Sequence, residues 1–139
     1  MLELRQQMAA RAENLGAIRQ WIAELCGRVP VEEPMASDVK LAVSEACANV
    51  VLHAYAGDEP GAVEIEAEPD GDLLRVVVRD HGHGIRPRPD SPGAGLGLPL
   101  IAALSEWVEV RRNEAAHRTE LVMTFQLRPH RELREKMHR

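Results

Sequence analysis

An alternation of apolar and acidic residues near the middle of the chain most limits what it can fold into. Val63, Ile65 and Ala67 alternate with three glutamates, which predicts a strand with one buried and one wet face. A turn sequence, Pro69 to Asp72, separates this segment from a second expected strand, Leu73 to Arg79. The two segments therefore predict a β-hairpin whose valine-rich second strand runs into a polar, glycine-containing sequence.

Two helices are expected before this hairpin. The first spans Asn14 to Leu25, and the second has Ser37 as its N-cap and runs to about Tyr55. Upstream, Leu2 to Arg5 alternates like a strand, although Leu4 and Met8 also continue the apolar stripe of the first helix. The local pattern leaves both possibilities open, and a short strand is favoured.

A third helix and a second hairpin are expected after it. Leu98 to Ser105 predicts an apolar helix, while Trp107 to Arg112 and Thr119 to Leu127 predict paired strands. This order predicts an α+β fold, a two-layer α/β sandwich with helices packed on one face of a mixed, mostly antiparallel sheet. With 139 residues, we expect one domain, residues 1–128, and a charged tail, residues 129–139.

Composition argues against several classes of function. The formal net charge of −5 opposes nucleic-acid phosphates and anionic membranes, and an aromatic content of 3% gives no platform for stacking bases. The chain has no run of 18 apolar residues and its start lacks the apolar region of a signal peptide, so we expect a cytoplasmic protein without membrane or direct nucleic-acid contacts. Cys26 and Cys47 lack metal-ligand spacing and are expected to be small core residues.

The second expected helix carries a row of polar residues. Glu45, Asn49 and His53 are spaced i, i+4 and i+8, so they share an arc of about 80° that should face outward. Opposite them lie the apolar residues expected to face the sheet, namely Val39, Val43, Ala46, Val50 and Ala54. The row is either a solvated helix face or a functional site. Apolar neighbours such as Leu41 and Leu52 are unusual for a face that meets only water.

Two glycine-containing segments follow in the sequence. Asp80-x-Gly82-x-Gly84 comes directly after a strand, where the glycines allow close backbone approach to a flat ligand or positive φ angles, although these are also common turn residues. Gly93-Ala94-Gly95-Leu96-Gly97 precedes a helix, whose free N–H groups are suited to phosphate oxygens. The lysine-containing phosphate-binding loop Gly-x-x-x-x-Gly-Lys does not occur in the chain.

In combination, the three segments resemble the motifs of the Bergerat-fold (GHKL) ATP-binding family, which includes gyrase, Hsp90, histidine kinases and MutL-type ATPases. Residues 41–55 (LAVSEACANVVLHAY) resemble its N box, residues 76–85 (VVVRDHGHGI) its G1 box and residues 93–101 (GAGLGLPLI) its G2 box. The resemblance is strongest to the small anti-sigma factor serine kinases, and it covers nearly the whole chain.

This resemblance implies ATP and Mg²⁺ as cofactors. Asn49 would hold Mg²⁺ through its amide oxygen, and Glu45 would be the general base that accepts a proton from an attacking serine hydroxyl. Asp80 would accept a hydrogen bond from the adenine amino group and so select adenine over guanine, with Thr119 near the base. The other positions implied to contact the nucleotide are Gly82, Gly84, Ile85, Gly93, Gly95, Leu96 and Gly97.

The sequence also departs from the family pattern. The segment between Ile85 and Gly93, which would cover the phosphates, is short and contains three prolines, whereas an Hsp90-like or gyrase-like cycle uses a long lid. His117 and Arg118 precede Thr119 where the family often has glycine. His53 has a counterpart in the anti-sigma branch, and its role is either packing or function.

The function implied by the resemblance is that of a protein serine/threonine kinase which is also an anti-sigma factor. It would phosphorylate an anti-anti-sigma antagonist protein, sequester a sigma factor and form a homodimer. Two alternatives stay open at this point: a nucleotide-dependent regulatory binding module without meaningful kinase activity, and a detached ATPase domain of a histidine kinase.

Overall fold

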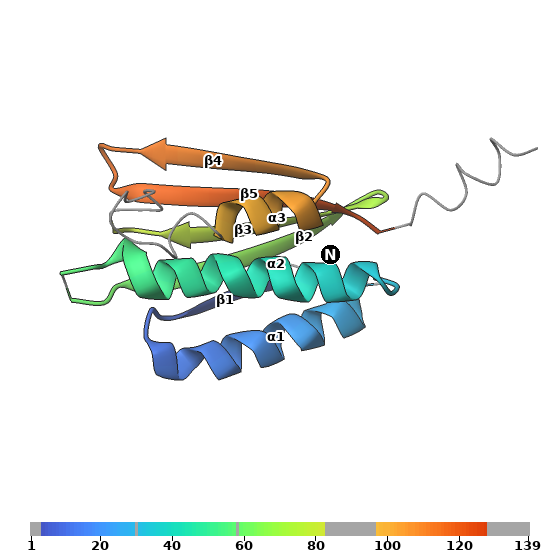
Figure 1. Ribbon diagram of the computed structural model, residues 1–139, viewed down its shortest axis with the longest axis horizontal. Helices are drawn as coiled ribbons and strands as arrows, with labels where there is room; N and C mark the ends of the chain where they lie inside the picture. Colours follow the sequence, from blue (N-terminus) through green and yellow to red (C-terminus); the bar gives the residue numbers. More distant parts are fainter. Residues whose placement is uncertain (1–3, 30, 58, 83–96, 128–139) are drawn as a thin grey trace, which may run out of the picture.

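The computed structural model describes residues 4–29, 31–57, 59–82 and 97–127. Along the chain its elements are β1 (Leu4–Ala9), the 3-10 turn η1 (Ala12–Asn14), α1 (Leu15–Arg28), α2 (Met35–Asn49), the π-helical turn η2 (Val50–Ala54), β2 (Ala62–Asp70), β3 (Leu73–Asp80), α3 (Gly97–Leu104), β4 (Trp107–Asn113) and β5 (Arg118–Gln126) (Figure 1). Each helix and strand expected from the sequence is present, with ends that differ by a few residues.

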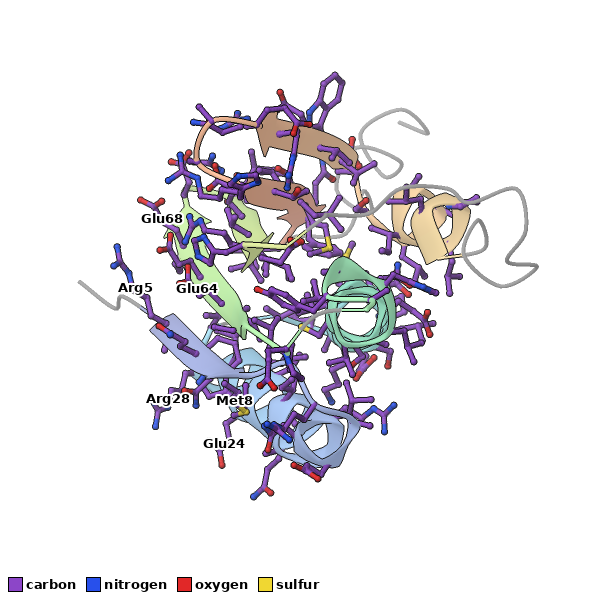
Figure 2. The ribbon with its side chains drawn as sticks, turned by 90° about the vertical axis from the view of Figure 1, so that its left-hand side faces the viewer. Arg5, Met8, Glu24, Arg28, Glu64 and Glu68 are labelled. Carbon is purple, nitrogen blue, oxygen red and sulfur yellow. The ribbon has the colours of Figure 1, made fainter. Side chains whose placement is uncertain are left out.

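The strands form one sheet in the order β1-β2-β3-β5-β4. All four pairings are antiparallel, so the described sheet has no parallel strand pair. Figure 2, an end-on view, shows α1, α2 and α3 together on one face of this sheet, with α2 between the other two helices. The two-layer α+β sandwich expected from the sequence is thereby confirmed.

The core lies between the helices and the sheet, and strand alternation selects its residues. Every second side chain of β3 and β5 faces the helices, and these residues are buried: Leu74, Val76, Val78, Leu121, Met123 and Phe125. The buried residues of α1 and α2 pack against these strand residues and include Ile18, Ile22, Leu25, Val39, Val43 and Ala46. Cys26 and Cys47 are both buried free thiols in this core, as expected.

The start of α2 differs from the expectation. Ser37 is not the N-cap, because the helix begins two residues earlier, at Met35. The Glu33 carboxylate takes over the capping role: Oε2 accepts hydrogen bonds from the Ser37 backbone N–H (3.2 Å) and hydroxyl (2.5 Å). These bonds hold the pKa of Glu33 below its usual value. The Ser37 N–H is thus bonded by a carboxylate from before the helix, whereas a serine at the N-cap would itself accept from an N–H two or three residues later.

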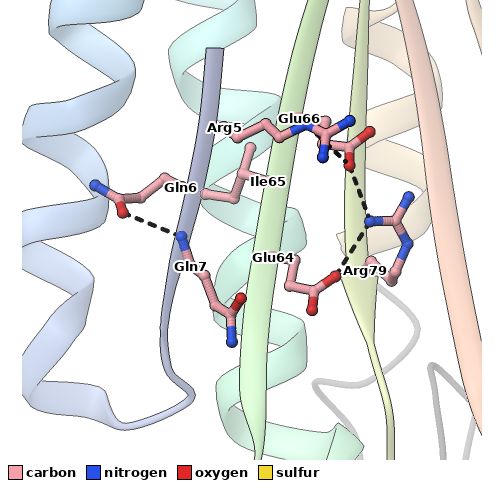
Figure 3. A pocket seen from close by; sticks show the side chains of 7 residues that line it. All are labelled: Arg5, Gln6, Gln7, Glu64, Ile65, Glu66 and Arg79. Carbon is pink, nitrogen blue, oxygen red and sulfur yellow. Dashed lines mark hydrogen bonds and ion pairs between the residues drawn. The ribbon is translucent and has the colours of Figure 1, made fainter. Parts of the chain in front are cut away.

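Charged side chains cover the sheet face that lies opposite the helices. Arg79 is their centre: Nη1 lies 3.1 Å from Glu64 Oε2 and 3.2 Å from Glu66 Oε1, and Nη2 lies 2.7 Å from Glu120 Oε2. Arg5 adds a longer contact, 3.5 Å, to Glu66. Arg5, Glu64, Glu66 and Arg79 line an open cleft of about 420 Å³ (Figure 3). Because the charges around Arg79 are paired with one another, this cluster contributes modestly to the stability of the sheet.

Within the part of the chain that the structure describes, no helix has both the length and the apolar character needed to cross a bilayer.

Candidate functional site

The candidate site lies at the end of the sheet where β3 stops and β5 begins. Asp80 and Thr119 are direct cross-strand partners there. Their position in the strand alternation places both on the helix side, and they are 1% and 3% exposed. Asp80 Oδ1 also accepts a hydrogen bond of 3.0 Å from the Gly82 N–H, which folds the chain into a tight turn after the strand. Two buried polar side chains therefore stand side by side under the helix layer.

Arg112, on the neighbouring edge strand β4, completes this polar group. It is the cross-strand partner of Thr119. Its Nη1 donates to Thr119 Oγ1 at 2.7 Å and to the carbonyl oxygen of Gly82 at 2.9 Å, while Nε makes a longer bond, 3.3 Å, to Glu114 Oε1. Sequence reasoning missed Arg112. Only the pairing of β4 with β5 places it across from Thr119, and no local pattern in the sequence reports that register.

Gly82 lies where the end of β3 meets the end of the α2–η2 helix. A Cβ atom at this position would overlap the Ala54 carbonyl oxygen and would come within 2.9 Å of Tyr55 Cδ1. The glycine is therefore needed for close approach of two backbone segments. This is a different reason from the approach to a flat ligand that the sequence suggested.

Tyr55 joins the same two parts of the fold. Its Oη donates to the Ala62 carbonyl oxygen at 2.6 Å and accepts from the His81 N–H at 2.9 Å. Burial raises the pKa of this phenol, and the His81 N–H opposes that rise. Because both bonds use backbone groups next to strand ends, Tyr55 ties the end of the helix to β2 and to the turn after β3.

The polar row on α2 is not simply a solvated face. Asn49 is 6% exposed, and its amide nitrogen Nδ2 has no hydrogen-bond partner among the described residues. The expectation that all three residues face outward is thus wrong for Asn49, while Glu45 and His53 are half-buried. Buried polar atoms are usually paired, so an unpaired buried amide at this position calls for an explanation such as a bound ligand or ion.

Glu45 lies one helical turn before Asn49, at the edge of a groove. The groove has a volume of about 440 Å³ and is lined by residues of α1 and α2, namely Arg19, Ser37, Lys40, Leu41, Ser44 and Glu45. A half-buried carboxylate in an open groove is accessible to a side chain brought in by another protein.

The other residues implied by the family resemblance either lie on α3 or lie outside the described residues. Gly97 begins α3, which packs against α2. The expected lid between Ile85 and Gly93, and the positions Gly84, Ile85, Gly93, Gly95 and Leu96, lie outside the described residues. The described part of the candidate site therefore consists of Asp80, Gly82 and Thr119, together with the polar row of α2.

The antiparallel sheet covered on one face by helices, with the buried Asp80 at the end of its central strand, agrees with the Bergerat-type sandwich that the sequence resemblance implies. The chain belongs to the histidine kinase-like ATPase domain family, whose model matches residues 8–125.

Proteins similar to this chain include serine-protein kinases and an anti-sigma factor. The serine-protein kinase RsbW of Bacillus subtilis is 37% identical over 125 residues, which cover 79% of this chain and 78% of RsbW. The RsbW kinase of Halalkalibacterium halodurans is 31% identical over 119 residues, covering 75% of this chain and 72% of the relative. The anti-sigma F factor of Clostridium beijerinckii is 30% identical over 115 residues, covering 75% and 80%.

A solved structure shares the fold. It contains the RsbU and RsbW domains of Rv1364c from Mycobacterium tuberculosis and matches with a TM-score of 0.73 at 24% identity. The match covers 93% of this chain and 34% of the longer one.

Proposed function

We propose that this protein is an ATP-dependent serine/threonine protein kinase and anti-sigma factor, which phosphorylates an anti-anti-sigma antagonist protein and sequesters a sigma factor in the cytoplasm. The observation that carries the proposal is the buried Asp80, held at the end of the central strand beside Thr119. The names of the relatives, a serine-protein kinase and an anti-sigma F factor, support the choice of substrate and partner.

Asp80 is suited to recognising the adenine base. An ionised carboxylate only accepts hydrogen bonds, and the adenine amino group donates them. A hydrogen bond to a charged group is worth about 1.5 to 3 kcal/mol, and guanine presents a carbonyl oxygen where adenine has its amino group. A guanine base would therefore place an acceptor against an acceptor, so we expect the site to select ATP over GTP.

Asn49 is suited to the metal that accompanies ATP. Mg²⁺ prefers oxygen ligands, takes few of them from the protein and takes others from phosphates. The amide oxygen of the buried Asn49 would hold the cation, while its unpaired Nδ2 is a donor and would suit a phosphate oxygen rather than the metal. Bound there, Mg²⁺ would supply neutralisation of phosphate charge. The chain itself would hold the cation through Asn49 and the adenine base through Asp80.

Glu45 is the proposed general base. It lies at i−4 from Asn49, so its Cβ is on the order of 5 to 6 Å from that of the proposed metal ligand. The serine hydroxyl oxygen of the antagonist attacks the γ-phosphorus of ATP, the bond to the ADP oxygen breaks, and the hydroxyl proton passes to the Glu45 carboxylate. The open groove at Glu45 gives a protein substrate access to this carboxylate.

Calorimetric titration with ATP and GTP in the presence of Mg²⁺ tests the nucleotide site. We expect saturable ATP binding, weaker GTP binding and loss of ATP binding in Asp80→Asn, with Glu68→Gln on the opposite sheet face as a control that binds normally. No heat with the wild-type protein would refute the nucleotide site.

Transfer of the γ-phosphate to an anti-anti-sigma protein of the same genome tests the kinase. Glu45→Ala should bind ATP and lose transfer; wild-type transfer rates in this variant would refute the assigned base. ATP binding without transfer by the wild-type protein would instead favour a nucleotide-dependent binding module. The resemblance also makes a homodimer part of the proposal, and sedimentation equilibrium tests it.

A further inference from the structure

We infer that Arg112 is a positioning residue of the nucleotide site, and that it fixes the Thr119 hydroxyl as a hydrogen-bond donor beside the Asp80 acceptor. The inference deepens the proposed function and rests on it. Its starting point is the pair of short bonds from one guanidinium nitrogen: Arg112 Nη1 to Thr119 Oγ1 at 2.7 Å and to the Gly82 carbonyl oxygen at 2.9 Å.

The chemistry of the two groups fixes the direction of the hydroxyl. A threonine hydroxyl has one hydrogen to donate and accepts through its oxygen, whereas a guanidinium group only donates. Since Nη1–H donates to Oγ1, the hydroxyl hydrogen has to point away from Arg112. Thr119 is only 3% exposed, so bulk water has little access to turn the hydroxyl into another orientation.

The neighbouring strand β3 places an acceptor, the Asp80 carboxylate, beside this donor. Asp80 is paired with Thr119 across β3 and β5, and side chains paired in this way have Cβ atoms about 4.5 to 5.5 Å apart. An acceptor and a donor thus stand side by side on the helix side of the sheet. Their complement in a ligand is an amino group next to a ring nitrogen that accepts a hydrogen bond.

Adenine has this edge, with its exocyclic amino group beside ring nitrogen N1. Guanine has the reverse, a carbonyl oxygen beside an N1–H donor, so both of its groups would meet the wrong partner. Thr119 contributes to this selection only while its hydroxyl donates, either to N1 directly or through one water molecule. Arg112 therefore contributes to the selection of adenine over guanine by orienting the Thr119 hydroxyl.

The second bond of Arg112 supports the first. By holding the Gly82 carbonyl oxygen, Arg112 ties the edge strand β4 to the turn that follows β3. The N–H of the same glycine donates to Asp80 Oδ1, so the turn is fastened on both sides. Asp80 keeps this backbone bond without Arg112, so replacing Arg112 should free the donor Thr119 and leave the acceptor Asp80 in place.

The test compares the affinity for ATP with that for 1-deaza-ATP, in which a C–H group replaces N1 and the amino group is kept. Titration calorimetry is run on the wild-type protein, Arg112→Met, Thr119→Val and the double variant. Arg111→Met is the matched control, because Arg111 is the preceding residue of the same strand, faces the opposite side of the sheet and pairs with the half-buried Glu109. Thermal unfolding of each variant confirms that it is folded.

We expect Arg112→Met to weaken ATP binding roughly ten-fold, the effect of one charge-oriented hydrogen bond. The same substitution should change the affinity for 1-deaza-ATP by less than about two-fold, because that ligand has no N1 acceptor to lose. In the Thr119→Val background it should add little further loss of ATP affinity, since the two residues act as one unit. Arg111→Met should bind both nucleotides like the wild-type protein.

Equal losses for ATP and 1-deaza-ATP in Arg112→Met would overturn the inference, because a merely structural residue affects both ligands alike. Independent, additive losses in the double variant would also overturn it. If Arg112→Met does not fold, Arg112→Lys replaces it: lysine keeps the charge but lacks the planar fork, so the preference of the variant for ATP over 1-deaza-ATP should shrink. If the wild-type protein binds no ATP, the proposed function itself fails, which is a different result from ATP binding that ignores Arg112.

Discussion

Replacing Gly82 by alanine tests the close contact between the end of β3 and the end of the helix. The added Cβ atom would overlap the Ala54 carbonyl oxygen and lie 2.8 Å from the Ala54 carbonyl carbon. Both atoms belong to backbone, so neither can swing aside as a flexible side chain would. The strand end or the helix end has to move instead.

The cost follows from this displacement. Overpacking of a closely packed position costs about 1 to 3 kcal/mol, and a clash with backbone belongs at the upper end of that range. Moving either segment also strains the two Tyr55 hydrogen bonds, each worth about 0.5 to 1.5 kcal/mol. We therefore expect Gly82→Ala to lower the free energy of unfolding by about 3 kcal/mol, which for a chain of this size is a fall in Tm on the order of 10 °C.

Urea unfolding followed by circular dichroism measures this change, and a second glycine provides the control. Gly27 lies in α1 and is exposed, and an added Cβ would meet no atom within 4 Å apart from its chain neighbours and its own helix backbone. Gly27→Ala should therefore stabilise the protein by roughly 0.5 to 1 kcal/mol, since alanine is the better helix former. The two substitutions should have opposite signs. A Gly82→Ala variant within about 0.5 kcal/mol of the wild-type protein would refute the packing argument, since surface substitutions stay within that range.

The charged sheet face and the core thiols give two further predictions. Arg79→Met leaves three carboxylates next to one another, so it should cost about 1 to 2 kcal/mol at pH 7, between the values for exposed and buried pairs. The Arg79 hydrogen bond holds the pKa of Glu120 below its ordinary value of 4.5. The stabilisation is therefore complete above pH 4.5 and is lost as the pH falls through the folded-state pKa. In urea unfolding at pH 7, 4 and 3, the stabilities of the wild-type protein and Arg79→Met should converge, and a constant difference would contradict this. Burial raises the pKa of Cys47 to about 12, so a thiol reagent at pH 8 should modify it only after unfolding in urea, and rapid labelling of the native protein would contradict its position in the core.

Much of the fold could be predicted because local patterns agree with the final packing. The alternation in β2 and β3 and the stripe of α1 each identify a buried face, and the faces are the ones buried in the structure. The boundaries were harder, because they depend on single side chains. α2 begins at Met35, and the Ser37 N–H is bonded by the Glu33 carboxylate, which no local pattern indicates. The local pattern also does not distinguish β1, Leu4–Ala9, from an extension of α1.

The site could be predicted only in part. The order of the polar row, the aspartate and the glycines in the sequence singles out Asn49, Asp80 and Gly82, which are buried or closely packed in the structure, while their contact with a nucleotide stays a prediction. The burial of Asn49 was not predicted, because helical spacing shows only which residues share a face of the helix. It does not show whether another part of the chain covers that face. Arg112 could not be found either: its role depends on the register of β4 on β5, which is a property of distant pairing.

The alignment of four residues in one row of the sheet limits which insertions and deletions this domain can accept. Val63, Asp80, Thr119 and Arg112 lie across β2, β3, β5 and β4 in consecutive pairings. One residue inserted in β5 between Thr119 and Leu121 would turn Thr119 to the charged face and separate it from both partners. Residues added to the β4–β5 turn, around His117, would leave the row intact. Chain length in this family should therefore vary at the turn and stay constant within the strands.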